Sequence, residues 1–425
     1  MPHVPIERHA LDNGLRVVLS RDPRAPAVAV NLWYDVGSKH EKRGKTGFAH
    51  LFEHMMFQGS ANVEKGQHFS MVQAAGGTLN ASTWLDRTNY YETLPGHELE
   101  LALWLEADRM SSLLPAMTQE KLDNQRDVVK NERRWSVDNQ PYGDWDERMQ
   151  ALVYPEGHPY HHPTLGSMED LSAASLEDVG EFFATYYAPN NAVLTLAGDF
   201  ETDAALDLIR RHFGPIPPNA NLPSPPDMGV DARIGSEVRV TIPDQVPLPR
   251  IYLAHRAPTF GTDAFDALDL AADVLGSGRA SRLYARLVRD EHLAQDVSVF
   301  LFPIVGGASM FSLWATARPG VEPEHLEAAA LEEVDRLATD GPTDADLDRV
   351  RNLHRAHTAG ALERIGERAD RLSMYTCLFD DPDRVNQEVA RYRSVGADRV
   401  RDAMTDSIRP DNRVTMTYVP AEGAA

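Results

Sequence analysis

Two histidines and a glutamate lie close together near the start of the chain, in the order His50-x-x-Glu53-His54. The stretch around them favours a helix, in which side chains four residues apart lie on the same face. The imidazoles of His50 and His54 can therefore converge on one metal ion, an arrangement typical of zinc. Glu53 would project beside that ion, where its carboxylate can take a proton from water instead of acting as a ligand.

The motif alone leaves an alternative open. Two ordinary histidines could flank a glutamate without binding a metal. Catalytic zinc usually has three protein ligands and a fourth position for water. A zinc site here therefore needs one more carboxylate, from a helix further along the chain.

A proline-rich segment separates the sequence into two predicted domains, the first of which contains this motif. Residues 214–226 contain six prolines, which exclude a helix interior or a central strand. We predict an N-terminal domain over residues 1–214, which holds the motif, a linker over residues 215–235, and a C-terminal domain over residues 236–425.

The two predicted domains share an order of elements: strand, turn, strand, loop, helix and glycine. This order predicts that each half is an α+β domain, with helices packed on an antiparallel or mixed sheet. The counterpart of the metal helix, within Asp263–Leu275, has Leu268, Ala271 and Ala272 at the positions of the motif. Only the first half is expected to bind metal.

Composition excludes several classes of protein. The 425 residues include 42 Lys and Arg against 64 Asp and Glu, a net charge of −22, which argues against nucleic-acid binding. The single cysteine, Cys377, rules out a disulfide framework. No apolar run is long enough to span a membrane. The first residues do not form a signal peptide, so we expect a cytoplasmic chain, or an exported one if a precursor segment was removed.

With these features, the sequence resembles the inverzincins of the pitrilysin and insulinase group, and within it the mitochondrial-processing-peptidase-like branch. In that group a glutamate about eighty residues after the motif completes the zinc site. The resemblance implies Glu132, 78 residues after His54, as the third ligand, with Glu120 on the same predicted helix as the alternative. Group members often place a second glutamate seven residues earlier, where this chain has Gln125.

A second match to the family is the stretch from Gly76 to Tyr91. In the family it forms an edge strand along which an extended substrate pairs. The resemblance implies substrate binding at Asn80, Ala81, Ser82 and Thr83; from the residues alone, a plain edge strand is the simpler reading. The second half is similar to the family in its segment from Leu275 to Tyr284.

The resemblance implies two related domains facing each other across a cavity, with one zinc ion per chain. It implies a zinc-dependent endopeptidase that hydrolyses peptides or unfolded segments, with Glu53 as the base. Two alternatives remain: a non-catalytic scaffold or core subunit of the same fold in a larger complex, and a different zinc hydrolase that shares only the motif.

The family also contributes an arginine and a tyrosine, seven residues apart, from the second domain. Aligned on Leu293 and Ala294, those positions hold Val288 and Gln295, which supply neither the charge nor the phenol. The resemblance therefore implies a heterodimer in which a related subunit supplies the pair. A homodimer or monomer remains possible if residues such as Arg282 or Tyr284 compensate.

Overall fold

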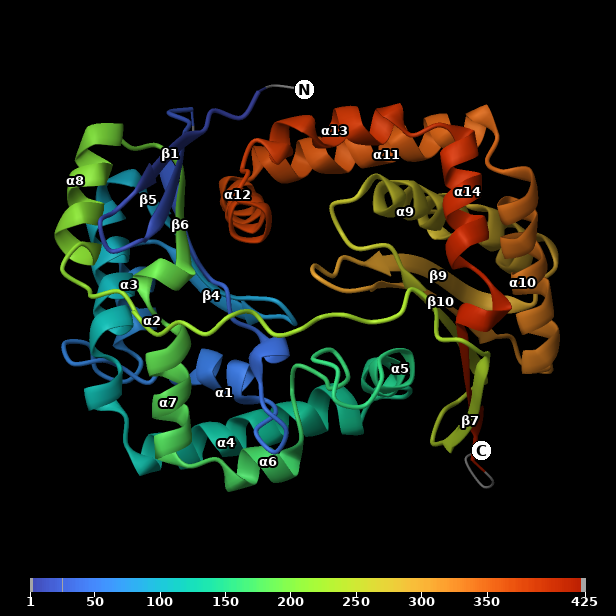
Figure 1. The fold of residues 1–425 in the computed structure, drawn as a ribbon, viewed down its shortest axis with the longest axis horizontal. Helices are drawn as coiled ribbons and strands as arrows, with labels where there is room; N and C mark the ends of the chain where they lie inside the picture. The colour runs from blue at the N-terminus through green and yellow to red at the C-terminus, as the bar shows by residue number, and fades with distance from the viewer. Residues whose placement is uncertain (1–2, 25, 422–425) are drawn as a thin grey trace. The chain divides into compact units, whose positions relative to one another are not determined.

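The computed structural model describes residues 3–24 and 26–421 and divides into two compact units. The first unit takes in the chain up to Arg133, then His162–Pro226 and Thr358–Gln387. The second takes in Arg134–His161, Asp227–His357 and the chain from Glu388 onward. Figure 1 labels many of their helices and strands.

A six-stranded sheet forms the centre of the first unit, in the order β1-β2-β6-β3-β5-β4. β2 and β6 run parallel and the other neighbours antiparallel, so the sheet is mixed. Its strands are β1 (Glu7–Ala10), β2 (Arg16–Arg21), β3 (Ala27–Tyr34), β4 (Thr78–Thr83), β5 (Thr88–Pro95) and β6 (Ala192–Gly198). β1 and β2 form a hairpin around Asn13-Gly14, with Gly14 at a φ of 85°.

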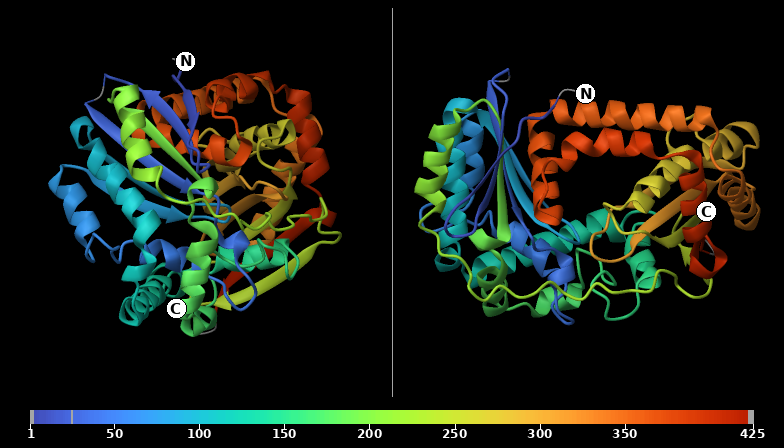
Figure 2. Two further views of the ribbon diagram at one scale, coloured as in Figure 1. Left: turned by 60° about the vertical axis from the view of Figure 1, so that its left-hand side comes forward. Right: turned by 45° about the horizontal axis from the view of Figure 1, so that its top comes forward.

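Helices cover both faces of this sheet, which explains why the central strands β3 and β6 are almost continuously buried. In the right-hand view of Figure 2, α3 and α8 lie on one face and α12 on the other. The helices of the unit are α1 (Phe48–Met55), α2 (Gln67–Ala74), α3 (Leu99–Ser112), α4 (Gln119–Arg133), α6 (Met168–Ala173), α7 (Leu176–Tyr186), α8 (Thr202–Phe213) and α12 (Ile365–Phe379). Short 3₁₀ helices are η1 (Ser38–His40), η2 (Gly96–Glu98), η3 (Leu114–Ala116) and η5 (Pro189–Asn191).

The second unit has a five-stranded sheet in the order β7-β11-β8-β10-β9. Its strands are β7 (Val238–Asp244), β8 (Arg250–Ala257), β9 (Ala294–Phe302), β10 (Ser309–Ala317) and β11 (Arg413–Pro420). Its helices are α5 (Trp145–Val153), α9 (Asp263–Gly276), α10 (Pro323–Asp340), α14 (Ala397–Ser407), the π-helical turns η4 (Arg134–Asp138) and η6 (Tyr284–Asp290), and the 3₁₀ turn η7 (Pro410–Asn412). Two long helices, α11 (Asp344–Glu363) and α13 (Arg384–Ser394), each contribute residues to both units.

The two sheets confirm the predicted relationship between the halves. The order β2-β6-β3-β5-β4 in the first sheet corresponds to β7-β11-β8-β10-β9 in the second. In each, the first pair is parallel and the next three pairs are antiparallel. Each half is thus an α+β unit built on one plan, as the sequence predicts.

The compact units are not the contiguous domains predicted over residues 1–214 and 236–425. α12 lies in the second half of the sequence yet packs on β3 and β6 of the first sheet. Its Ala369 is fully buried against Ala29 and Ala197, because three small side chains allow the helix to approach the sheet closely. Conversely, residues 134–161 belong to the second unit.

Among the described residues, no helix combines the length and the apolar character needed to cross a bilayer, in agreement with the absence of a predicted span.

Candidate functional site

The motif helix α1 has an apolar face and a polar face. Phe48, Leu51, Phe52 and Met55 are buried in the core of the first unit. His50, Glu53 and His54 are therefore left on the opposite side, where they can face other elements.

A buried carboxylate fixes the start of α1. Glu41 accepts hydrogen bonds from the backbone N–H groups of Gly47 (2.8 Å) and Ala49 (2.7 Å). Gly47 has a φ of 85°, and a Cβ at this position would lie 2.5 Å from the carbonyl oxygen of Leu165. The glycine is thus required both by its conformation and by this close approach. Glu41 was not identified from the sequence, because its position outside the helix gives no capping-box pattern.

The structure brings His50, His54 and Glu132 together. Glu132 Oε1 lies 3.7 Å from His50 Nε2, and Glu132 Oε2 lies 3.3 Å from His54 Nε2. One ligand atom from each of the three residues lies within 4.8 Å of the others. Zinc bonds in tetrahedral geometry separate neighbouring ligand atoms by about 3.4 Å. Two imidazoles and one carboxylate at this spacing fit zinc.

The electrostatic environment favours the protonation states that a metal needs. Burial, together with the nearby His54, lowers the pKa of His50 to about 4, which keeps its imidazole neutral. The hydrogen bond from His54 lowers the pKa of Glu132, which favours its carboxylate form. The other glutamate considered from the sequence, Glu120, is exposed in the first turn of α4 and is not part of this cluster.

Glu53 lies beside the cluster and is held by β4. Its Oε2 accepts a hydrogen bond from Thr83 Oγ1 at 2.6 Å. Burial raises the pKa of Glu53, and the bond from Thr83 partly offsets that effect. A carboxylate with a raised pKa is a stronger base than one in water, as general-base catalysis requires.

The predicted substrate strand lies at the edge of the first sheet. Within the described part of the chain, β4 pairs with β5 alone, so its other edge has no neighbouring strand. Along it, Ala81 is buried and Thr83 contacts Glu53, whereas Ser82 faces Asn89 of β5, as alternation in a strand requires. Asn80 uses its own side-chain oxygen to accept from the Ala81 N–H (2.9 Å).

Gln125, the residue at the family's second glutamate position, is buried within α4. Its amide nitrogen donates to Asn124 Oδ1 at 3.0 Å.

A second cluster of possible ligands, His68, Glu92 and Glu106, is fully buried in the same unit. Arg109 donates two hydrogen bonds to Glu106 and lies over the ring of Tyr90. The guanidinium therefore already supplies the positive charge that a metal would bring. On charge grounds, the cluster at α1 is the better zinc site.

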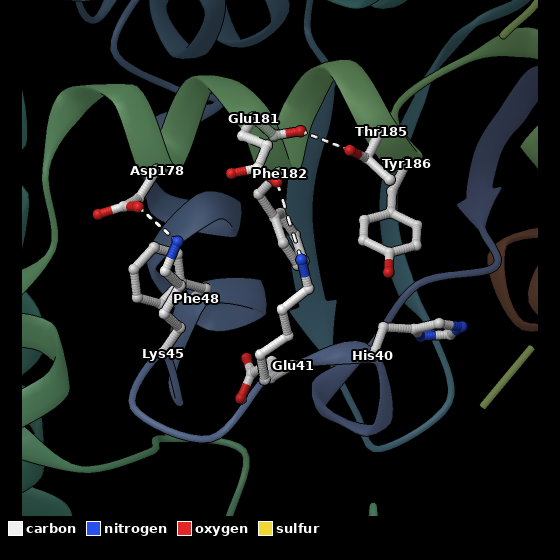
Figure 3. A pocket seen from close by; sticks show the side chains of 10 residues that line it. His40, Glu41, Lys45, Phe48, Asp178, Glu181, Phe182, Thr185 and Tyr186 are labelled. Carbon is white, nitrogen blue, oxygen red and sulfur yellow. Dashed lines mark hydrogen bonds and ion pairs between the residues drawn. The ribbon is translucent and has the colours of Figure 1, made fainter. Parts of the chain in front are cut away.

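A pocket beside the N-terminal end of α1 is drawn in Figure 3. Aromatic side chains, including Phe48 and Phe182, line it together with the ion pair of Lys45 and Asp178 (2.6 Å). Its lining includes Glu41 but none of the four residues of the candidate site, which are His50, Glu53, His54 and Glu132. This hollow is separate from the candidate site.

Comparison with known proteins agrees with this geometry. Residues 16–153 match the family model described as "Insulinase (Peptidase family M16)", and residues 173–353 match "Peptidase M16 inactive domain". The chain is 32% identical over 388 residues to the zinc protease PqqE of Helicobacter pylori, covering 88% of this chain and 84% of that protein. Subunit 1 of the human cytochrome b-c1 complex is 28% identical over 273 residues, covering 63% of this chain and 54% of the subunit.

Solved structures share the fold. A protease from Helicobacter pylori has a TM-score of 0.92 at 27% identity, covering 99% of this chain and all of that one. The periplasmic protease PqqL of Escherichia coli has a TM-score of 0.79 at 18% identity, covering all of this chain but 48% of that one, which shows likeness of fold alone. With two family models matching in order and a relative at 32% identity along most of its length, the chain belongs to peptidase family M16.

Proposed function

We propose that this protein is a zinc-dependent endopeptidase that hydrolyses peptides or unfolded polypeptide segments. One observation carries the proposal: His50, His54 and Glu132 converge at zinc-ligand spacing, with Glu53 held beside them. A non-catalytic scaffold has no physical need for three convergent ligands next to an oriented carboxylate.

In the proposed reaction, each residue has one task. The imidazoles of His50 and His54 and the carboxylate of Glu132 hold one zinc ion, which when bound supplies Lewis-acid activation of water and of the scissile carbonyl. Glu53 takes a proton from the attacking water as the oxygen bonds to the carbonyl carbon. It then gives that proton to the departing amine as the C–N bond breaks.

The edge of β4 would bind the substrate. Residues Asn80 to Thr83 lie on the edge of β4 that has no neighbouring strand in the described sheet, and an extended peptide would add there as a further strand. Because Thr83 contacts Glu53 directly, a peptide paired here would pass beside the base. This binding mode requires an extended segment, which excludes a folded chain as the direct substrate.

The test combines metal analysis with hydrolysis of a quenched fluorescent peptide. Wild-type protein is expected to hold one zinc per chain and to cleave the peptide. Glu53→Gln should retain zinc and lose about 10²- to 10⁴-fold in rate, because the amide keeps the shape without the base. Glu120→Gln is the matched control and should behave as wild type. Absence of stoichiometric zinc would favour the scaffold, and near wild-type turnover by Glu53→Gln would refute the mechanism.

We further propose that full activity requires a related partner subunit. The position aligned with the family's arginine holds Val288, which is buried in the core of the second unit. The neighbouring Arg289 is exposed and bonded to Asp290 (2.7 Å). Gln295, at the position aligned with the family's tyrosine, is exposed at the start of β9. Solution mass and peptidase activity of the purified chain test this: full activity without a second kind of chain would contradict it. The cytoplasmic location stays a prediction from the sequence.

A further inference from the structure

α12 contributes a carboxylate to the face of the first sheet opposite α3 and α8 (Figure 2). Asp370 Oδ1 accepts hydrogen bonds from three side chains: Trp33 Nε1 (2.8 Å), Asn89 Nδ2 (3.0 Å) and Asn31 Nδ2 (3.3 Å). All three donors are buried. One oxygen atom thus ties β3 and β5 to a helix from the far end of the sequence.

This contact fixes the orientation of the Asn89 amide. A carboxylate oxygen can only accept, so the Asn89 nitrogen must face Asp370. The amide oxygen is then left for β4, where it accepts from Ser82 Oγ at 2.7 Å and from Arg87 Nη1 at 3.0 Å. A rotated amide would place its nitrogen against both donors.

Arg87 completes the connection to the edge strand. Its Nη1 donates to the backbone carbonyl of Ser82 at 2.7 Å, and its guanidinium lies 5.2 Å from the centre of the Trp33 ring. Ser82 is therefore held through both its hydroxyl and its carbonyl. The next residue, Thr83, is the one that binds Glu53.

We propose that Asp370 is a positioning residue that fixes the edge strand β4 relative to Glu53. Through Asn89 and Arg87 it holds Ser82, so that an extended peptide pairs with β4 in one register and presents one bond to the metal centre. The inference rests on the proposed function for its catalytic consequence. The placement of β4 itself can be measured without any activity.

The same helix provides a matched control. Ser373, one turn beyond Asp370, donates to Thr195 Oγ1 of β6 at 2.8 Å and is fully buried. Ser373→Ala removes a hydrogen bond between α12 and the same sheet, but not one that leads to β4. If loosening of α12 from the sheet alone speeds exchange in β4, Ser373→Ala should speed it too.

The first readout is amide hydrogen exchange of residues 78–83 in the full chain. Asp370→Ala should exchange faster there by about tenfold, the loss expected for one charge-assisted hydrogen bond. Asp370→Asn, which keeps an acceptor oxygen, should restore most of the protection. Ser373→Ala should leave the exchange of β4 unchanged. Equal exchange in Asp370→Ala and wild type, or the same change in Ser373→Ala, would overturn the inference.

The second readout is peptide hydrolysis by zinc-loaded protein. Asp370→Ala should raise KM about tenfold for a peptide long enough to pair along β4, with kcat within about threefold of wild type and zinc content unchanged. A fall in kcat with unchanged KM would overturn the positioning role. If wild-type protein binds no stoichiometric zinc and cleaves no peptide, the proposed function fails, while the exchange experiment still decides where Asp370 acts.

Discussion

Replacing Glu132 by alanine tests the ligand set most directly, because the same helix offers its own control. Glu132 and Glu120 are both in α4 (Gln119–Arg133), twelve residues apart. At about 1.5 Å per residue, they are separated by about 18 Å along the helix axis. A single zinc ion cannot bind both, and Glu132 contacts both histidines.

The expected size of the effect follows from linkage between zinc binding and folding. Zinc at a hundredfold excess over its dissociation constant stabilises the folded protein by about 2.7 kcal/mol. For a unit of this size that is a rise in melting temperature of about 5–10 °C. If loss of the Glu132 carboxylate weakens binding a hundredfold, the same zinc concentration contributes only about 0.4 kcal/mol.

The assay is thermal unfolding of wild type, Glu132→Ala and Glu120→Ala, each stripped with a chelator and titrated with zinc. Wild type and Glu120→Ala should show the zinc-dependent rise, and Glu132→Ala should show little of it. A full rise in Glu132→Ala, or its loss in Glu120→Ala, would refute the assignment of the third ligand.

Three further predictions concern the elements around the site. Gly47→Ala should lower unfolding free energy by about 1–3 kcal/mol more than Gly44→Ala, since both have positive φ but only a Cβ at Gly47 meets backbone; equal losses in chemical denaturation would contradict this. Thr83→Val should move the acidic limb of the kcat/KM profile to higher pH, because Glu53 loses the bond that lowers its pKa; an unmoved limb would exclude Glu53 as the titrating base. Burial raises the pKa of Glu92 from 4.5 to about 7, so folded protein binds this proton more tightly than unfolded protein. Glu92 alone should therefore contribute a loss of up to about 3 kcal/mol in unfolding free energy between pH 4.5 and 7, and the difference in stability between wild type and Glu92→Gln should change by about that amount in denaturation curves measured across this range.

The sequence predicted what depends on local periodicity. The helix around His50 and His54, the helix that carries Glu132 and the edge strand from Asn80 to Thr83 all lie where the pattern places them. Helical spacing alone puts the two histidines on one face. The choice of Glu132 as candidate third ligand came from family resemblance, because nothing local to Glu132 distinguishes it from Glu120.

Contacts between residues far apart in the sequence could not be predicted from local patterns. The pattern of Ile365–Phe379 predicts an ordinary helix of the second half. Its packing on the first sheet depends on contact among the small residues Ala29, Ala197 and Ala369. The bonds of Asp370 join residues more than 280 positions apart. A pattern within one segment cannot report a partner at that distance along the chain.

The two units indicate that the proposed chemistry depends on the side chains of α1 and α4 rather than on the shared fold. Five strands of the first sheet, β2-β6-β3-β5-β4, have the strand order of the second sheet, and α9 is the counterpart of α1. In α9 the motif positions hold Leu268, Ala271 and Ala272, all buried in the core of the second unit. The carboxylate of Asp266 is bonded to Arg391 (3.1 Å) and buried, so it is not available as a ligand. In the same architecture, the residues of α9 at the motif positions are buried in the core, whereas α1 has a polar face directed at Glu132. The proposed reaction is therefore limited to one site per chain.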